Sequence, residues 1–361
     1  MDAKNKLYSY LNTAIQNDAS DIHFIADERT KLRIKDTLVS VGDILTGEEL
    51  KAIILAGMTE DQKDCLKVNK EVDFGLRIPQ IGRFRVNAFT SQGNIEAVMR
   101  VIKENVKNHS ELSLPPIINK LASLHDGLIL VSGATGSGKS TTLAAMIDFI
   151  NATENKRIIT VEDPVEIVHR NKKSVISQRE VGEDTPSFGV ALKSLMRQNP
   201  DVILIGEIRD KETATSALQA AQTGHLVLST IHASSAEETI NRFAGIYPSE
   251  ERPNVKKALA FTLKGVIAQR LIVNTQQDKI PVMEIMTSSR RVQDSILADA
   301  NDESAKESLH AIIQEESVND MITTDQYLIN LVIKKEITKE KAIMEAHNTL
   351  WTRQQIQLRG L

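Results

Sequence analysis

The stretch GATGSGKSTT at residues 133–142 follows the apolar run GLILVS, and it constrains the fold more than any other feature of the chain. Residues Gly133 to Ser140 match G-x-x-x-x-G-K-S, the spacing of a phosphate-binding loop between a strand and a helix. The glycines at 133, 136 and 138 let the backbone wrap a phosphate with its N–H groups. The helix that follows directs its positive end at the same anion.

Two side chains of this loop predict the ligand. Lys139 can reach the β- and γ-phosphates of a nucleotide, and the hydroxyl of Ser140 can bind Mg²⁺. The sequence therefore predicts a site for a nucleoside triphosphate with magnesium.

The region from about Gly127 alternates buried strands with helices. The predicted strands are LILVSG, RIITVED, DVILIGE and HLVLSTIH, and the helical runs between them are KSTTLAAMIDFIN, FGVALKSLMRQN and KETATSALQAAQ. Short apolar strands with helical crossovers are typical of a mostly parallel sheet that is covered on both faces. We therefore expect an α/β fold for this region, followed by about 100 mainly helical residues.

The first hundred residues have a different pattern. They predict an amphipathic helix over residues 1–17, two strands, a helix from about Thr46 to Lys67 and three further strands, which together form a small α+β unit. Thr46 with Glu49 is a capping box for the later helix. The polar stretch KENVKNHSELS is typical of a linker. We predict one domain at 1–102, a linker at 103–113 and a second domain at 114–361, helical from about 275.

Acidic residues end two of the predicted parallel strands. Glu162 and Asp163 come from IITVEDPVE, and Glu207 comes from VILIGE. Ligands of open parallel sheets bind at the carboxyl ends of strands, where the phosphate loop also lies. One carboxylate there can hold the magnesium shell while another polarises the attacking water. For Asp163, which precedes a proline, a turn or capping role is the alternative.

Two histidines flank the strand of GHLVLSTIHASSA. His225 and His232 are seven residues apart, so extended chain separates them by roughly 23 Å and only a bend would bring both to one phosphate. His232 lies on the phosphate side and is predicted to sense the γ-phosphate. His225 is either a nucleotide contact or a structural group.

Three arginines lie on short strands of the first domain. Arg83 and Arg85 are two residues apart, so their side chains share one sheet face, and Arg100 lies on a later strand. They are either a solvated edge or arginine fingers that reach a phosphate bound by a neighbouring subunit of a ring.

Composition excludes several other classes of protein. The net charge of −4 and pI of about 6.1 give no support for a non-specific nucleic-acid binder. The single cysteine, Cys65, excludes an intramolecular disulfide and a cysteine-based zinc knuckle. No stretch approaches the ~20 apolar residues of a membrane span, and the N-terminus MDAKNKLYSYLN lacks a signal-peptide core. We therefore expect a cytoplasmic protein.

The motifs together resemble the secretion ATPase superfamily of bacterial type IV pili and type II and IV secretion systems, most closely the pilus retraction ATPases of PilT/PilU type. The resemblance covers about 250 residues. It runs through ASDIHF, GRFRVNAF, GATGSGKSTTLAAMIDFIN, ITVEDPVE, ISQREVG, LMRQNPDVILIGEIRD and GHLVLSTIHASSAEETINR to AQRL.

This resemblance implies a role for each motif. It makes Glu162 the general base, places Glu207 at the magnesium shell and lets the three arginines face nucleotide across subunits. Asp163 and His225 belong to the Asp-box and His-box motifs of the nucleotide site. The Walker A loop comprises Gly133, Ala134, Thr135, Gly136, Ser137, Gly138, Lys139, Ser140 and Thr141.

The resemblance also implies a fold and a function. It implies a PAS-like first domain, a RecA-like second domain, a hexameric ring and an ATP-driven motor for pilus retraction. The ring would act on an inner-membrane platform protein from the cytoplasmic side, with a second pilus ATPase as a further partner. An assembly motor usually has an added N-terminal region and a four-cysteine zinc element, which are not found in this sequence.

Other readings stay open. VQDSILADANDESAKESLHAII stands where PilT typically has AIRNLIRE, so an accessory PilU-like motor or the motor of a divergent pilus fits equally well. A nucleotide-gated partner of another motor, and an ATPase of a protein-secretion or DNA-transfer system, are the remaining alternatives.

Overall fold

The computed structural model describes residues 2–35, 37–102, 109, 111–298 and 308–361. The chain divides into two compact units. The first comprises residues Met1–Asn105 with two later segments, Asp163–Val168 and Glu180–Asp184, and the second comprises the rest. The boundary after Asn105 falls within the predicted linker at 103–113, of which residues 103–108 and 110 lie outside the described part.

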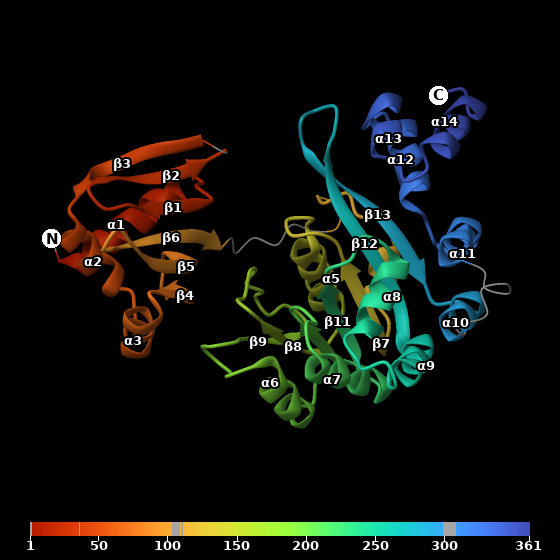
Figure 1. The fold of residues 1–361 in the computed structure, drawn as a ribbon, viewed down its shortest axis with the longest axis horizontal. Coiled ribbons are helices and arrows are strands. Elements are labelled where there is room, and N and C mark those ends of the chain that lie inside the picture. The colour runs from red at the N-terminus through yellow and green to blue at the C-terminus, as the bar shows by residue number, and fades with distance from the viewer. Residues whose placement is uncertain (1, 36, 103–108, 110, 299–307) are drawn as a thin grey trace. The chain divides into compact units, whose positions relative to one another are not determined.

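The first unit is built on a six-stranded antiparallel sheet in the order β3-β2-β1-β6-β5-β4, shown in red to orange in Figure 1. Leucines of α1 and α2 are buried against this sheet in one hydrophobic core. Its elements are α1 (Ala3–Gln16), β1 (Asp21–Phe24), β2 (Glu28–Ile34), β3 (Thr37–Leu45), α2 (Gly47–Leu55), α3 (Glu60–Asn69), β4 (Glu71–Ile78), β5 (Gly82–Ser91) and β6 (Asn94–Ile102).

Two predictions for this unit need correction. The helix expected at Thr46–Lys67 is two helices, because a second capping box, formed by Thr59 and Gln62, begins α3 after the turn at Gly57. The second predicted strand is likewise two, β2 and β3, which pair as an antiparallel hairpin. The capping box of Thr46 and Glu49 is present as predicted.

The second unit is built on a seven-stranded sheet in the order β13-β12-β7-β11-β10-β8-β9. The pairs from β12 to β8 are parallel, and β12 with β13 is antiparallel. Its first elements are α4 (Ile117–Ala122), β7 (Gly127–Ser132), α5 (Lys139–Thr153), β8 (Arg157–Glu162), β9 (Val175–Glu180), α6 (Phe188–Leu195), η1 (Met196–Gln198), β10 (Val202–Ile205), α7 (Lys211–Gln222) and β11 (Leu226–Ile231). The later elements are α8 (Ala236–Gly245), α9 (Arg252–Thr262), β12 (Leu263–Val273), β13 (Lys279–Thr287), α10 (Arg290–Leu297), α11 (Leu309–Glu315), η2 (Ser317–Asn319), α12 (Thr324–Ile333), α13 (Lys339–Glu345) and α14 (Thr349–Leu358).

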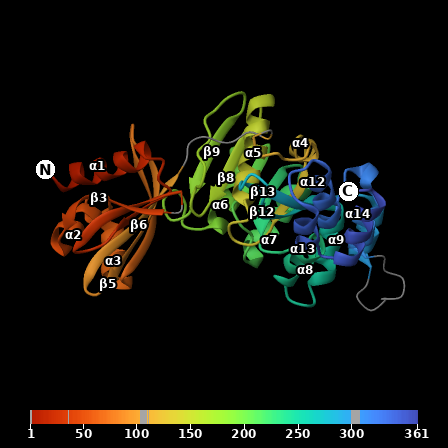
Figure 2. The ribbon, with the colours of Figure 1, turned by 90° about the horizontal axis from the view of Figure 1, so that it is seen from above.

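Helices cover both faces of this sheet. Ile129 and Val131 of β7 share one core with side chains of α4, α5 and α12. The alternate residues, Leu128 and Leu130, are also fully buried, and α7 and α8 pack against β7. Figure 2 gives a second view of these helices around the strands. The strands are therefore buried on both sides, as their continuous apolar sequence predicts.

The expectation of a mainly helical C-terminal region from about 275 is only partly right. The region contains β13, and the long strand β12 comes just before it; helices take over from Arg290. β9 also extends the sheet beyond the four strands predicted from sequence. Among the described residues, no helix is long and apolar enough to cross a bilayer.

Candidate nucleotide site

The phosphate loop connects β7 to α5, as the motif predicts. Gly133, Gly136 and Gly138 all have positive φ angles, between 78° and 148°, which L side chains rarely adopt. A Cβ at Gly133 would lie 2.2 Å from the backbone oxygen of Gln269. Gly138 precedes α5 without a side-chain cap, so the helix directs its first N–H groups at the loop. This loop is a ready-made cradle for an anion.

The ammonium group of Lys139 folds back over the loop. Its Nζ atom donates to the carbonyl oxygens of Gly133 and Ala134, at 2.9 Å in each case. The charge therefore lies at the mouth of the loop, where a β- or γ-phosphate would compete for it. Ser140, in the first turn of α5, presents the hydroxyl oxygen expected to reach magnesium, and Mg²⁺ prefers such oxygen ligands.

A buried glutamine from a distant strand braces the loop. The Nε2 atom of Gln269, on β12, donates to the carbonyl oxygen of Ser137 at 2.8 Å, and its Oε1 atom accepts from the hydroxyl of Thr142 at 2.7 Å. Gln269 is only 6% exposed. This role was not predicted from the sequence, although a polar pair inside the apolar run VIAQRLIV is a signal that the strand serves a site.

The carboxyl ends of the parallel strands meet beside this loop. Ile231 of β11 pairs with Ser132 of β7, so His232 is next to the start of the loop in register. Glu207 follows β10, the neighbour of β11. The Glu207 carboxylate lies 3.3 Å from His232 Nε2 and 2.7 Å from the guanidinium of Arg209. The structure thus brings Glu207 and His232 together, next to a small cavity of about 270 Å³.

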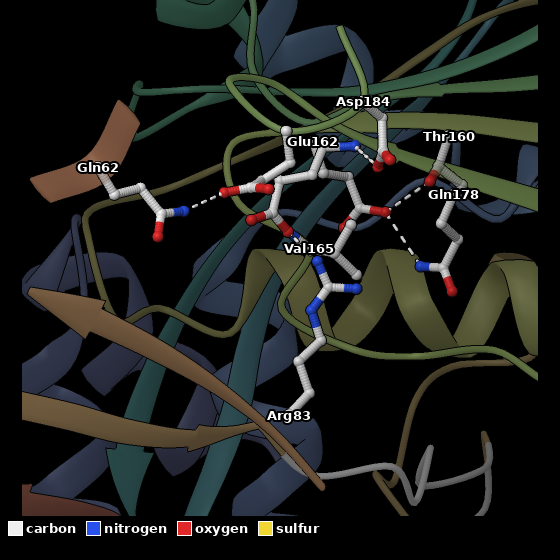
Figure 3. Close-up of polar contacts among 9 residues, drawn as sticks. Gln62, Arg83, Thr160, Glu162, Val165, Gln178 and Asp184 are labelled. Atoms are coloured by element: carbon white, nitrogen blue, oxygen red, sulfur yellow. Dashed lines mark hydrogen bonds and ion pairs between the residues drawn. The ribbon is translucent and has the colours of Figure 1, made fainter. Parts of the chain in front are cut away.

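Glu162 ends β8 at the same edge of the sheet. Its Oε1 atom accepts a hydrogen bond of 2.6 Å from the hydroxyl of Thr160 and one of 3.2 Å from Nε2 of Gln178. Figure 3 shows both donors directed at the carboxylate. Gln178 was not predicted as a site residue, because β9 was not among the predicted strands.

His225 lies at the opposite edge of the sheet. Its carbonyl oxygen accepts from Gly127 N–H at the start of β7, whereas the phosphate loop follows the end of β7. Its Nδ1 atom is 3.0 Å from the carbonyl oxygen of Ala220 and 3.2 Å from the hydroxyl of Thr223. Within one subunit the strand length separates His225 from His232, and His225 closes the end of α7 instead.

The three arginines lie on one face of the first unit's sheet. Arg85 pairs directly with Arg100 across β5 and β6, and Arg83 is two residues before Arg85. Each forms an ion pair: Arg83 with Glu180, Arg85 with Asp73 at 2.8 Å and Arg100 with Asp21 at 2.9 Å. The shared face agrees with the sequence pattern, and the role in a neighbouring site remains a prediction.

Glu180, the partner of Arg83, is the most buried carboxylate of this group. It is 2% exposed and also accepts a hydrogen bond of 3.1 Å from the N–H of Val165. Arg83, labelled in Figure 3, forms its ion pair with this carboxylate. Gly75 of β4 makes room for it, since a Cβ there would lie 2.4 Å from Glu180 Oε1. Asp163, which is exposed and precedes Pro164, belongs to this same unit.

A larger cavity also borders the phosphate loop. It has a volume of about 880 Å³, and Gly138, Thr141, Gln269 and Leu271 line it together with the turn at 274–278. Small-molecule sites typically enclose ~300–1,000 Å³. The cavity is therefore large enough for the base and sugar of a nucleotide whose phosphates lie in the loop.

Comparisons with known proteins agree with this chemistry. A family model described as type II/IV secretion system protein matches residues 3–358. The chain is 40% identical over 306 residues to a twitching motility protein of Neisseria gonorrhoeae, which covers 84% of this chain and 80% of that protein. It is 38% identical over 325 residues to the type IV pilus retraction ATPase PilT of Pseudomonas aeruginosa, covering 90% and 93%.

A solved structure supports the fold. The crystal structure of the pilus retraction motor PilT with bound ADP matches with a TM-score of 0.85 and 36% identity, over 94% of this chain and 97% of that one. The predicted fold class, a small α+β domain followed by a RecA-like ATPase domain, is confirmed by this match.

Proposed function

Since the chain belongs to the family of type II/IV secretion system ATPases, we propose that it is a hexameric, Mg-ATP-hydrolysing motor that powers type IV pilus retraction. That the protein is a nucleotide-binding ATPase follows from the family itself. The observation that supports the finer proposal is the complete phosphate loop beside two strand-end carboxylates, in a chain whose relatives include named pilus retraction motors.

The proposed reaction uses the residues of one sheet edge. The N–H groups of the loop and Lys139 hold the phosphates, while Ser140 and Glu207 would hold magnesium. When bound, Mg²⁺ neutralises the charge of the phosphate oxygens. Glu162 accepts a proton from the attacking water as the new oxygen–phosphorus bond forms, and the bond from the γ-phosphorus to the bridging oxygen breaks to release ADP.

The direction of pilin movement and the partners are part of the same proposal. The ring would act at the cytoplasmic side of the inner membrane on a platform protein, alone or with a second pilus ATPase. We expect no direct binding of nucleic acid, since the net charge is −4.

The base assignment is tested by Glu162→Gln. The variant should bind nucleotide with unchanged affinity but hydrolyse it at least ~100-fold more slowly, because it cannot accept the proton. Phosphate release and titration with a fluorescent nucleotide measure the two properties separately. Glu166→Gln, an exposed position four residues later, is the matched control and should behave as the wild type. Normal turnover by Glu162→Gln would refute the assignment.

The biological direction is tested by deleting the gene. Cells that carry excess pili that never shorten would support retraction. Bald cells would indicate an assembly motor, and normal pili with lost secretion or DNA transfer would assign the protein to another system.

A further inference from the structure

Gln178 on β9 lies between two groups whose hydrogen-bonding chemistry fixes its orientation. Its Oε1 atom is 2.8 Å from the backbone nitrogen of His169, and its Nε2 atom is 3.2 Å from Oε1 of Glu162. A backbone N–H can only donate, so the amide oxygen faces His169 and the NH₂ group faces Glu162. Gln178 is therefore a hydrogen-bond donor to the carboxylate.

A second donor reaches the same oxygen from another strand. The hydroxyl of Thr160 is 2.6 Å from Glu162 Oε1, and Thr160 is only 1% exposed. Thr160 precedes Glu162 by two residues on β8, so the two side chains share one sheet face. Donors from two neighbouring strands that converge on one oxygen restrict both the torsion and the plane of the carboxylate (Figure 3).

Several titratable and charged groups surround this pair. Burial lowers the pKa of His169 to about 4, so the imidazole near Gln178 is neutral at physiological pH, with Asp148 and Lys172 as the charges that act on it. Glu207 follows β10, the strand next to β8, Arg179 and Glu180 follow Gln178 on β9, and Asp163 follows Glu162.

We propose that Gln178 is a positioning residue of the ATPase reaction which, together with Thr160, holds the Glu162 carboxylate ionised and oriented toward the attacking water. The inference rests on the proposed function, in which Glu162 is the general base. The His169 N–H fixes which way the Gln178 amide faces. Its NH₂ group therefore donates to Glu162, which a side chain that only fills space would not do.

Two measurable effects follow. A carboxylate that loses a donor is held less firmly, so kcat should fall by roughly 10-fold without a change in KM for ATP. Hydrogen bonds to the ionised carboxylate also stabilise that form, so the loss of a donor favours protonation of the base. The acidic limb of the pH–rate profile should therefore move to higher pH.

The test compares Gln178→Leu with Gln178→Glu in the full-length protein. Leucine removes the donor, whereas glutamate still accepts the His169 N–H but places a second carboxylate against Glu162. The shift of the acidic limb should be larger for Gln178→Glu than for Gln178→Leu. At the second donor, Thr160→Ser should keep the wild-type pH–rate profile, because serine retains the hydroxyl. Thr160→Val should move the acidic limb to higher pH.

Ser177→Ala is the matched control, because Ser177 lies on the same strand but bonds Arg157 and not Glu162. It should keep the wild-type kcat and profile. Gln178 variants that bind nucleotide and keep both the wild-type kcat and the wild-type acidic limb, while Glu162→Gln is inactive, would overturn this inference alone. Full turnover by Glu162→Gln would overturn the base assignment and this inference with it.

Discussion

Gln269 shows how a single side chain outside the motif can shape the phosphate loop. Its amide joins Ser137 in the loop to Thr142 in the helix that follows, and its backbone oxygen occupies the space that a side chain at Gly133 would need. The loop geometry therefore depends on β12 as well as on its own glycines.

We expect Gln269→Leu to weaken nucleotide binding on the order of 10-fold, because it leaves the Ser137 carbonyl and the Thr142 hydroxyl without this buried partner. Titration with a fluorescent ADP analogue measures the loss. Gln357→Leu, at an exposed position on α14, serves as control. Unchanged affinity in a folded Gln269→Leu protein would show that the glycines alone set the loop.

The residues of the phosphate loop could be predicted because a phosphate is held by groups that are close together in sequence. Gly133, Lys139 and Ser140 lie within eight residues of one another. Gln269 and Ser137 are 132 residues apart, and Gln178 and Glu162 are 16 apart on different strands. No spacing rule in a single sequence reports such pairs, because only the sheet brings them together.

At the scale of elements, β13 holds α8 through a buried carboxyl group. Oε1 of Glu284 accepts the N–H of Ala236, in the first turn of α8, at 2.8 Å. Burial raises the pKa of Glu284 above its ordinary 4.5, partly offset by this hydrogen bond and by His310 and His347, while Asp325 adds to the increase. The loop that carries His232 leads directly into this helix.

This raised pKa predicts how stability depends on pH. Between pH 4.5 and the higher folded-state pKa, Glu284 keeps its proton in the folded protein but has lost it in the unfolded chain. The free energy of unfolding therefore falls as the pH rises through this range. Glu284→Gln retains an acceptor for Ala236 and removes the charge. It should therefore be more stable than the wild type near pH 8 and similar near pH 4, as judged by urea unfolding. Glu237→Gln on α8 is the control, and equal pH slopes for Glu284→Gln and the wild type would contradict the prediction.

The elements that sequence patterns predicted correctly are those with a clear period or a punctuated end. The four central strands and the helices α5, α6 and α7 belong to this class. β12 was missed because a short, mostly apolar run such as VIAQRLIV fits a buried helix as well as a buried strand. Its pairing with β7 and β13 decides the matter, and that pairing is not local.

At the scale of the whole molecule, the units do not follow simple sequence ranges. Asp163–Val168 and Glu180–Asp184 group with the first unit, although the former lies between β8 and β9 and the latter begins at the last residue of β9. Their contacts span long stretches of chain, since Arg83 pairs with Glu180 97 residues away and Gln62 bonds Glu183 121 residues away. A composition shift near residue 103 could indicate one boundary between the units. It could not indicate that these two later segments belong to the first unit.

If the subunits form a ring and share their nucleotide sites, two inactive variants should restore each other's activity when they are mixed. Lys139→Ala lacks a phosphate contact, and Arg85→Ala lacks an arginine proposed to act on the neighbour. The ion pair of Arg85 with Asp73 is partly exposed, so its loss should not disturb folding. In a mixed ring, an Arg85→Ala subunit keeps its own loop and can receive Arg85 from a Lys139→Ala neighbour, so ATP hydrolysis should reappear on mixing and rise with protein concentration. Arg29→Ala, on β2 of the same sheet, should be active without a partner. Variants that form mixed rings yet remain inactive would refute the sharing of sites between subunits.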